Sequence, residues 1–309
     1  MAFAQLLANA VLLGCLVLVL PKGSICLSGP GQCAGSVNLV PQQRLFTSEP
    51  PPELFGNPEN PSPGMRESHN WSQKNWLKSR FHFSFAEYGH GPNNFGVLRV
   101  MNDDLVQPLR GFGPHPHRDM AILTFVVDGF LTHKDSTGAE ETLGRGSIQF
   151  MTAGTGVVHS EHNLDEQPLR FIQCWILPRV RGAPPTYGSM PGDATSGRQR
   201  LNGWFHAVGD DLKGGEYPVK INQDCNMYIS ELTPGTAVPR YLNAGRQGYL
   251  LCVEGEVHLN AGGSDNYVMQ RHDAAELKGP LLLEATGGTD GALVLLFEME
   301  LTEDSRGEL

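Results

Sequence analysis

Two short stretches of the chain carry residues that could bind a metal ion. The first places His115 and His117 two positions apart in GFGPHPHRDM, and the second places His159 two positions before Glu161 in GTGVVHSEHN. Residues i and i+2 of a strand point to the same face, so each pair can project into one cavity. Three imidazoles and one carboxylate suit a divalent first-row metal and leave positions open for a substrate or oxygen.

The clustering of histidines favours ligation, although each residue alone has a plainer interpretation. A single histidine on a strand is usually a surface or hydrogen-bonded residue, but five of the eleven histidines lie between positions 115 and 162. His162 should alternate away from the face that carries Glu161. His133, in FLTHKDS, is either a cavity residue beside the site or a solvated strand residue.

Apolar strands beside the two motifs offer candidates for a substrate pocket. Phe125, Phe150 and Met151 could line a flat aromatic pocket. For at least two of the three we expect core packing instead.

Short alternating runs predict the elements that must position these residues. From about Trp76 the chain alternates apolar and polar residues in segments such as FGVLRVMN, AILTFVVDG and RFIQCWILP, each bounded by Gly, Pro, Asn or Asp. This pattern is typical of an all-β sandwich or barrel. Pro116 restricts its own strand to an edge or an end, where a ligand pair at a cavity mouth would lie.

A weak internal repeat suggests two barrels. The run LTFVVDG ends at Gly129 and YLLCVEG ends at Gly255, which defines an offset of 126 residues. The same offset carries His115 and His117 onto Tyr241 and Asn243. We therefore expect a second barrel that lacks the metal ligands.

The N-terminal segment has a different composition from the rest. Residues 1–48 contain no Asp or Glu, and residues 4–20 form an apolar run whose length suits a signal peptide; an uncleaved membrane anchor is the alternative. Residues 46–64 are Pro-rich and read as a linker. We expect a leader and linker over 1–64, a metal-binding barrel over 65–185 and a metal-free barrel over 186–309. The leader favours a secretory or organelle location over a cytoplasmic or nuclear one.

Composition excludes several classes of partner and site. The net charge of −10 disfavours direct nucleic-acid binding, because phosphates attract a basic surface. The six cysteines include no CxxC pair, and Cys174 and Cys252 lie in apolar runs that predict buried free thiols. Membrane contact is expected only through an uncleaved leader, and we expect a monomer.

The motifs resemble the two cupin motifs, with one departure. Gly156, His159 and Asn163 match the second motif, but Ala121 and Ile122 stand where the first motif usually has Glu. A glutamate two positions after the last histidine, here Glu161, is typical of the pirin family. The chain also resembles this family in the stretches HPHRDM, HKDSTG, QCWILP and NWLKSRFHFSFAEY. Within that family the chain is most similar to the bacterial pirin-like quercetin 2,3-dioxygenases.

This resemblance implies a fold, a cofactor and a reaction. It implies a bicupin, with two double-stranded β-helix (jelly-roll) barrels face to face. The first barrel would hold Fe(II), or another divalent metal such as Mn, Ni, Cu or Zn, through His115, His117, His159 and Glu161. The substrates would be O2 and a flat flavonol-like aromatic compound, with Glu161 also acting as the catalytic base. An alternative from the same family is an iron-dependent, redox-sensing transcriptional cofactor that acts through protein contacts.

Overall fold

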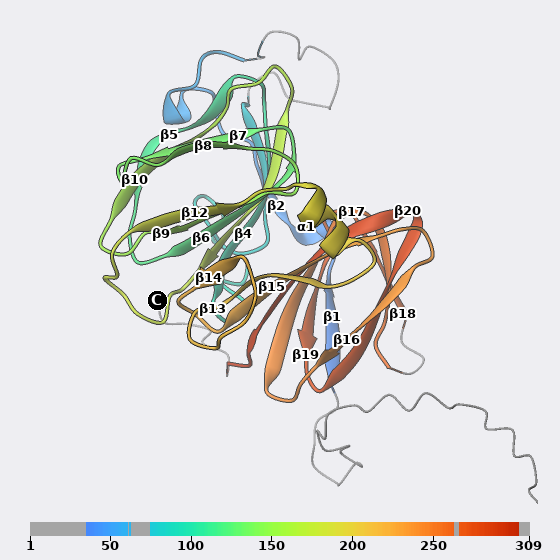
Figure 1. Ribbon diagram of the computed structural model, residues 1–309. Coiled ribbons are helices and arrows are strands. Elements are labelled where there is room, and N and C mark those ends of the chain that lie inside the picture. The colour runs from blue at the N-terminus through green and yellow to red at the C-terminus, as the bar shows by residue number, and fades with distance from the viewer. Residues whose placement is uncertain (1–34, 61, 63–74, 263–265, 303–309) are drawn as a thin grey trace, which may run out of the picture. The chain divides into compact units, whose positions relative to one another are not determined.

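The fold was analysed in a computed structural model that describes residues 35–60, 62, 75–262 and 266–302. The leader predicted over residues 4–20 lies outside the described residues. Within the described ranges, no helix is long and apolar enough to cross a membrane. Strands dominate, which confirms the all-β prediction (Figure 1).

The first barrel consists of two sheets. The four-stranded sheet has the order β5 (Arg110–His117), β10 (Val157–Asn163), β7 (Leu131–Asp135) and β8 (Glu140–Leu143). The seven-stranded sheet has the order β12 (Thr186–Met190), β9 (Ile148–Thr152), β6 (Ala121–Asp128), β11 (Leu169–Ile176), β4 (Leu98–Val106), β3 (Leu77–Phe81) and β2 (Phe46–Ser48). β5 is an edge strand, as Pro116 predicted, and it ends at His117.

The second barrel is one nine-stranded sheet. Its main path runs β1 (Ser36–Val40), β19 (Ala274–Lys278), β17 (Arg246–Asn260), β20 (Leu281–Glu300), β15 (Cys225–Leu232), β13 (Phe205–Asp210) and β14 (Val219–Ile221). β16 (Ala237–Leu242) pairs with β20, and β18 (Asn266–Gln270) pairs with β17. The short helix α1 (Ala194–Arg200) follows β12, and two 3-10 turns, η1 (Gln42–Arg44) and η2 (Leu54–Gly56), precede β3. This two-barrel arrangement confirms the predicted bicupin.

One hydrophobic core joins the barrels. It combines residues of β4, β6 and β11 with residues of β15, β17 and β20, among them the fully buried Tyr249 and Phe297. A buried arginine also connects the two barrels. Arg170 of β11 forms a bidentate ion pair with Asp103 of β4 and donates a hydrogen bond to the carbonyl of Val253 in β17 at 2.8 Å. The larger sheet of the first barrel therefore packs against strands β15, β17 and β20 of the second.

The predicted boundaries are wrong at both ends of the first barrel. Residues 36–40 form β1 and pair with β19, and residues 46–48 form β2 and pair with β3, so part of the predicted leader and linker is folded. These two strands are too short to show an alternation of apolar and polar residues, and the strands with which they pair lie further along the chain. β12 still belongs to the first barrel because it pairs with β9, so the second barrel begins after it rather than at residue 186.

Positions 126 residues apart have the same backbone conformation at the two glycines, but not the same burial at the positions matched to the histidine ligands. Gly129 and Gly255 both have a left-handed backbone, with φ of 78° and 70°, and a side chain on either would clash with a neighbouring carbonyl. Tyr241, however, is 55% exposed, whereas Leu242 beside it is 2% exposed and belongs to the core. The offset of 126 residues therefore carries His115 onto an exposed position of the second barrel, because one shared run does not determine the register of the next strand.

The buried thiols were predicted correctly. Cys174 and Cys252 are free and buried, as is Cys225. Burial raises the pKa of Cys252 to about 12, so this thiol stays protonated at neutral pH.

Candidate metal centre

Strand pairing brings the three predicted histidines together. In the antiparallel pair of β5 and β10, His159 lies directly opposite His115. Their Nε2 atoms are 3.0 Å apart, and the ring of His117 is 4.8 Å from each of the other two rings. The three possible ligand nitrogens lie within 4.8 Å of one another. The spacing in the sequence therefore produces a three-histidine cluster at the edge of the first barrel.

The protonation of the cluster suits a bound cation. Burial lowers the pKa of His117 to about 3 and that of His159 to about 4, with neighbouring histidines adding to the effect, so both imidazoles are neutral at pH 7. Nδ1 of His115 donates to the carbonyl of Gly113 at 2.8 Å, so Nε2 is the nitrogen that faces the cluster. Converging imidazole nitrogens are the kind of donor set that binds a divalent metal.

Glu161 is buried beside the cluster in a polar cage. Its Oε1 accepts hydrogen bonds from the amide of Gln149 at 2.7 Å and from the hydroxyl of Thr124 at 3.3 Å. Its Oε2 accepts from the amide of Gln173 at 2.7 Å. Burial raises the pKa of Glu161, but the charge of the surrounding histidines and the hydrogen bond from Gln173 lower it more, so the net pKa is below its ordinary value. The side chain is therefore a carboxylate at neutral pH.

A fourth histidine completes a second group. His133 is fully buried, and it forms a group with His159 and Glu161 whose ligand atoms lie within 4.8 Å of one another. Its Nε2 bonds Asp135 at 3.0 Å, and its ring stacks on Tyr187 at 4.4 Å. Its burial rules out the solvated strand residue and places His133 beside the site. Glu161 belongs to this second group and not to the three-histidine group.

Unpartnered polar atoms provide a test of whether a metal fits. Nδ1 of His133 and Nδ1 of His159 are buried, and neither has a hydrogen-bond partner within the described part of the chain. Buried polar atoms without partners are rare and mark functional sites or missing ions. A divalent cation would also compensate the charge of Glu161, which accepts hydrogen bonds from the neutral groups of Thr124, Gln149 and Gln173. The residues present fit a divalent metal.

His162 and the three apolar pocket candidates lie outside both groups. His162 lies on β10 with its side chain on the other face from Glu161 and joins neither group, as predicted. Phe125 and Met151 are 3% and 1% exposed and belong to the core, so they do not line a pocket. The ring of Phe150 packs against Gly188 and the same core.

Sequence reasoning missed the polar cage around Glu161. Thr124, Gln149 and Gln173 come from β6, β9 and β11, three strands of the larger sheet. Each is a polar residue inside an otherwise apolar run, in AILTFVV, SIQFM and RFIQCWI. A buried polar residue in such a run must find a partner, and that signal could have singled them out.

Fold and site together define a two-barrel cupin with a candidate metal centre in its first barrel, and the comparisons with known proteins agree. Residues 64–176 match the family model described as Pirin, and residues 212–299 match the one described as Quercetinase C-terminal cupin domain. The chain is 37% identical to a pirin-like protein of Caulobacter vibrioides over 72% of its own length and 92% of that protein. It belongs to the pirin family.

A curated sequence and a solved structure from Escherichia coli extend this finding. The quercetin 2,3-dioxygenase of strain K12 is 38% identical over 188 residues, which cover 60% of this chain and 78% of that protein. The crystal structure of the bacterial pirin YhhW in complex with nickel(II) superposes with a TM-score of 0.68 at 28% identity and covers 86% of this chain and all of that one. Relatives in this family thus bind a metal.

Proposed function

We propose that this pirin is a metal-dependent dioxygenase that opens flavonol-like substrates with O2 and releases carbon monoxide. The observation that carries the proposal is the cluster of three histidines beside a buried carboxylate. The similarity to a quercetin 2,3-dioxygenase supports the substrate class. Fe(II) is the metal we propose for this chain, with nickel as the first alternative because a relative binds it.

In this proposal, His115, His117 and His159 hold the ion, and Glu161 supplies the anionic ligand. A redox-active metal would supply the electronic route by which triplet O2 reacts with a closed-shell substrate. The carboxylate of Glu161 groups with His159, which would also hold the ion, and not with His115 or His117. The proposed ligand set is therefore three imidazoles and one carboxylate.

Glu161 is also the base that we propose for the reaction. A flavonol 3-hydroxyl must lose its proton before the ring becomes electron-rich enough to react, and Glu161 is ionised and buried next to the cluster. The amides of Gln149 and Gln173 hold the carboxylate in place and cannot take up the proton themselves. The nearby pair of His133 and Asp135 keeps the wall of the site polar.

Three variants test the assignment. Glu161→Gln keeps the size but loses the charge and the proton affinity, so we expect partial metal content and loss of quercetin turnover. His159→Ala should lose the metal itself. His162→Ala is the matched control on the same strand and should retain both. Metal content is measured by mass spectrometry, and turnover by the flavonol absorbance and released carbon monoxide.

The outcomes separate the two roles of Glu161. Wild-type turnover by Glu161→Gln at full metal occupancy would show that Glu161 is not the base. Full metal content in His159→Ala would remove the ligand assignment. A wild-type protein that holds iron but consumes no flavonol would contradict the proposed reaction.

A further inference from the structure

A segment outside both family matches packs against the candidate metal centre. Residues 53–60 were expected to be linker, but the side chain of Asn57 forms two hydrogen bonds with the backbone of Gly111 in β5, each 2.8 Å long. Arg110, beside Gly111, donates through Nε to the side chain of Asn60 at 3.1 Å. The segment is therefore fastened to the strand that carries His115 and His117.

These contacts place the ring of Phe55 on the histidine cluster. Phe55 has a left-handed backbone with φ of 58°, a conformation that a bulky residue adopts only where its surroundings impose it. Its ring centroid is 5.5 Å from that of His115 and 5.4 Å from that of Phe112, with edge-to-face geometry. A side chain at Gly113 would clash with the carbonyl of Phe55, so the glycine allows this close approach. Phe55 remains 44% exposed.

We propose that Phe55 forms one wall of the entrance to the metal centre and contributes to the selection of flat aromatic substrates. This inference rests on the proposed function. A partly exposed ring that touches His115 can stack on, or meet edge-to-face, a planar ligand beside the cluster. Asn57 is a positioning residue, because it holds the segment that presents Phe55 and does not itself contact the histidines.

The test measures ligand binding separately from turnover. The probe is quercetin, titrated into the iron-loaded full chain under anaerobic conditions and followed by its absorbance, and KM and kcat are then measured with O2. For Phe55→Ala we expect quercetin affinity to fall about three- to tenfold, the energy of one aromatic contact. Metal content and kcat should change by less than about twofold, since no proposed ligand or base is altered. Asn57→Ala should weaken binding in the same direction.

Controls and outcomes keep this inference apart from the proposed function. Tyr241→Ala removes an aromatic ring of similar exposure from the second barrel and should leave binding unchanged. If quercetin binds and depends on Phe55 but is never consumed, the proposed reaction fails and the role of Phe55 stands. If Phe55→Ala binds and converts quercetin with wild-type constants, Phe55 is not part of the entrance.

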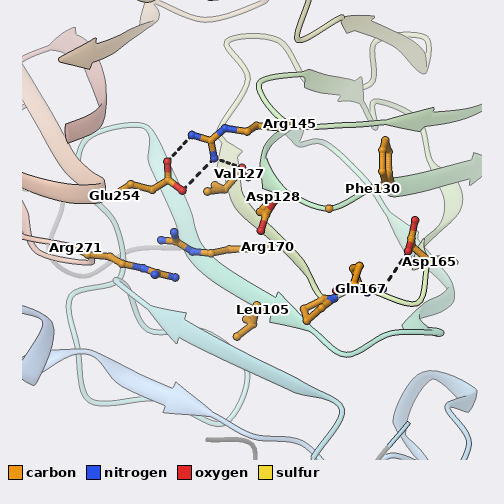
Figure 2. A pocket seen from close by; sticks show the side chains of 12 residues that line it. Leu105, Val127, Asp128, Phe130, Arg145, Asp165, Gln167, Arg170, Glu254 and Arg271 are labelled. Atoms are coloured by element: carbon orange, nitrogen blue, oxygen red, sulfur yellow. Dashed lines mark hydrogen bonds and ion pairs between the residues drawn. The ribbon is translucent and has the colours of Figure 1, made fainter. Parts of the chain in front are cut away.

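A cavity of about 570 Å³ is lined by residues of both barrels (Figure 2). Arg145 and Glu254 form a two-pronged ion pair at 2.6 and 3.0 Å, which satisfies both charges. The side chain of Arg271 is exposed and has no hydrogen bond or ion pair with any residue that the structure describes. Figure 2 shows its guanidinium in the cavity beside that of Arg170.

The guanidinium groups of Arg271 and Arg170 face the same cavity. Burial and the like charge of Arg170 lower the pKa of Arg271, whereas the charges of Asp103 and Glu254 raise it. Arg170 uses Nε and Nη2 for Asp103 and the carbonyl of Val253, and its Nη1 has no acceptor among the described residues. An anion would pair with free donors on both side chains and remove their repulsion.

We propose that this cavity binds a small organic carboxylate. Its anionic end would pair with Arg271 and Arg170, and its apolar body would lie on Leu105 and Val127, which also line the cavity. The cavity falls within the ordinary size of small-molecule sites. The site is distinct from the histidine cluster, because none of the proposed metal ligands lines it.

Calorimetry with three probes tests this second site. Benzoate should bind the full chain at one site, while benzamide, the neutral analogue, should not, and inorganic phosphate should bind more weakly because it has no apolar body. Arg271→Gln should weaken benzoate binding at least about tenfold, the effect of losing one charged partner. Arg181→Gln removes an exposed arginine elsewhere and is the matched control. Three results would overturn the proposal. They are unchanged benzoate binding in Arg271→Gln, loss of benzoate binding in His159→Ala, and no binding to the wild type at millimolar benzoate.

Discussion

The buried carboxyl of Asp104 should make the protein less stable as the pH rises. Asp104 lies on β4 inside the first barrel and is 2% exposed, and the hydroxyl of Ser79 donates to it. No cation forms an ion pair with it in the described part of the chain. Burial raises the pKa of Asp104 to about 8, and the charges of Asp103 and Glu161 act in the same direction.

The expected magnitude follows from proton linkage. The unfolded chain releases this proton near pH 4, whereas the folded protein holds it until about pH 8, so the unfolded state gains stability over the pH range between them. Each pH unit in that window lowers the free energy of unfolding by up to about 1.4 kcal/mol. At pH 7 the loss is therefore at most about 4 kcal/mol, and water penetration would reduce it to roughly 2–4 kcal/mol.

The substitution Asp104→Asn removes the titration and keeps a group that can bond Ser79. We expect equal stability of variant and wild type at pH 4, and a growing advantage of the variant up to pH 8. Urea unfolding of the metal-free protein at several pH values measures the difference. Asp290→Asn, at an exposed position, is the control. A variant that is less stable than wild type at pH 7 would show that Asp104 is ionised and paired in the folded protein, and the reasoning would be refuted.

Three further predictions follow from the same structure. Burial lowers the pKa of His82 to about 4, so stability should fall by up to about 3 kcal/mol as the pH drops from 6.5 to 4, and His82→Gln should lack this loss in urea titrations. A chain that starts at Met65 lacks β1, whose residues Val37 and Leu39 pack against the core of the second barrel. Its free energy of unfolding should be roughly 3 kcal/mol lower than that of a chain that starts at Ala34. Equal urea midpoints would contradict this. Metal analysis of the purified protein should find one ion per chain, and two ions would contradict a single metal centre.

The N-terminal segment shows where local sequence information ends. Residues 53–60 have no apolar periodicity. Asn57 and Asn60 are held by hydrogen bonds with a strand about fifty residues further along the chain. A Pro-rich composition is the same for a free linker and for a segment held by such contacts. Only the folded chain distinguishes the two.

The sequence by itself determined the strand-rich fold and the histidine cluster. Side chains alternate along a strand as a local property, so the spacing of His115 and His117, and of His159 and Glu161, was sufficient to predict which faces they share. Strand pairing then brought the three histidines together, as the spacing implied.

The tertiary structure alone decided the surroundings of Glu161. The residues that hold it come from three strands whose order in the sheet cannot be read from the sequence, and His133 joins it from a fourth. The physical reason is that cross-strand neighbours depend on which strands pair and in which register, and these are chosen by the packing of the whole barrel.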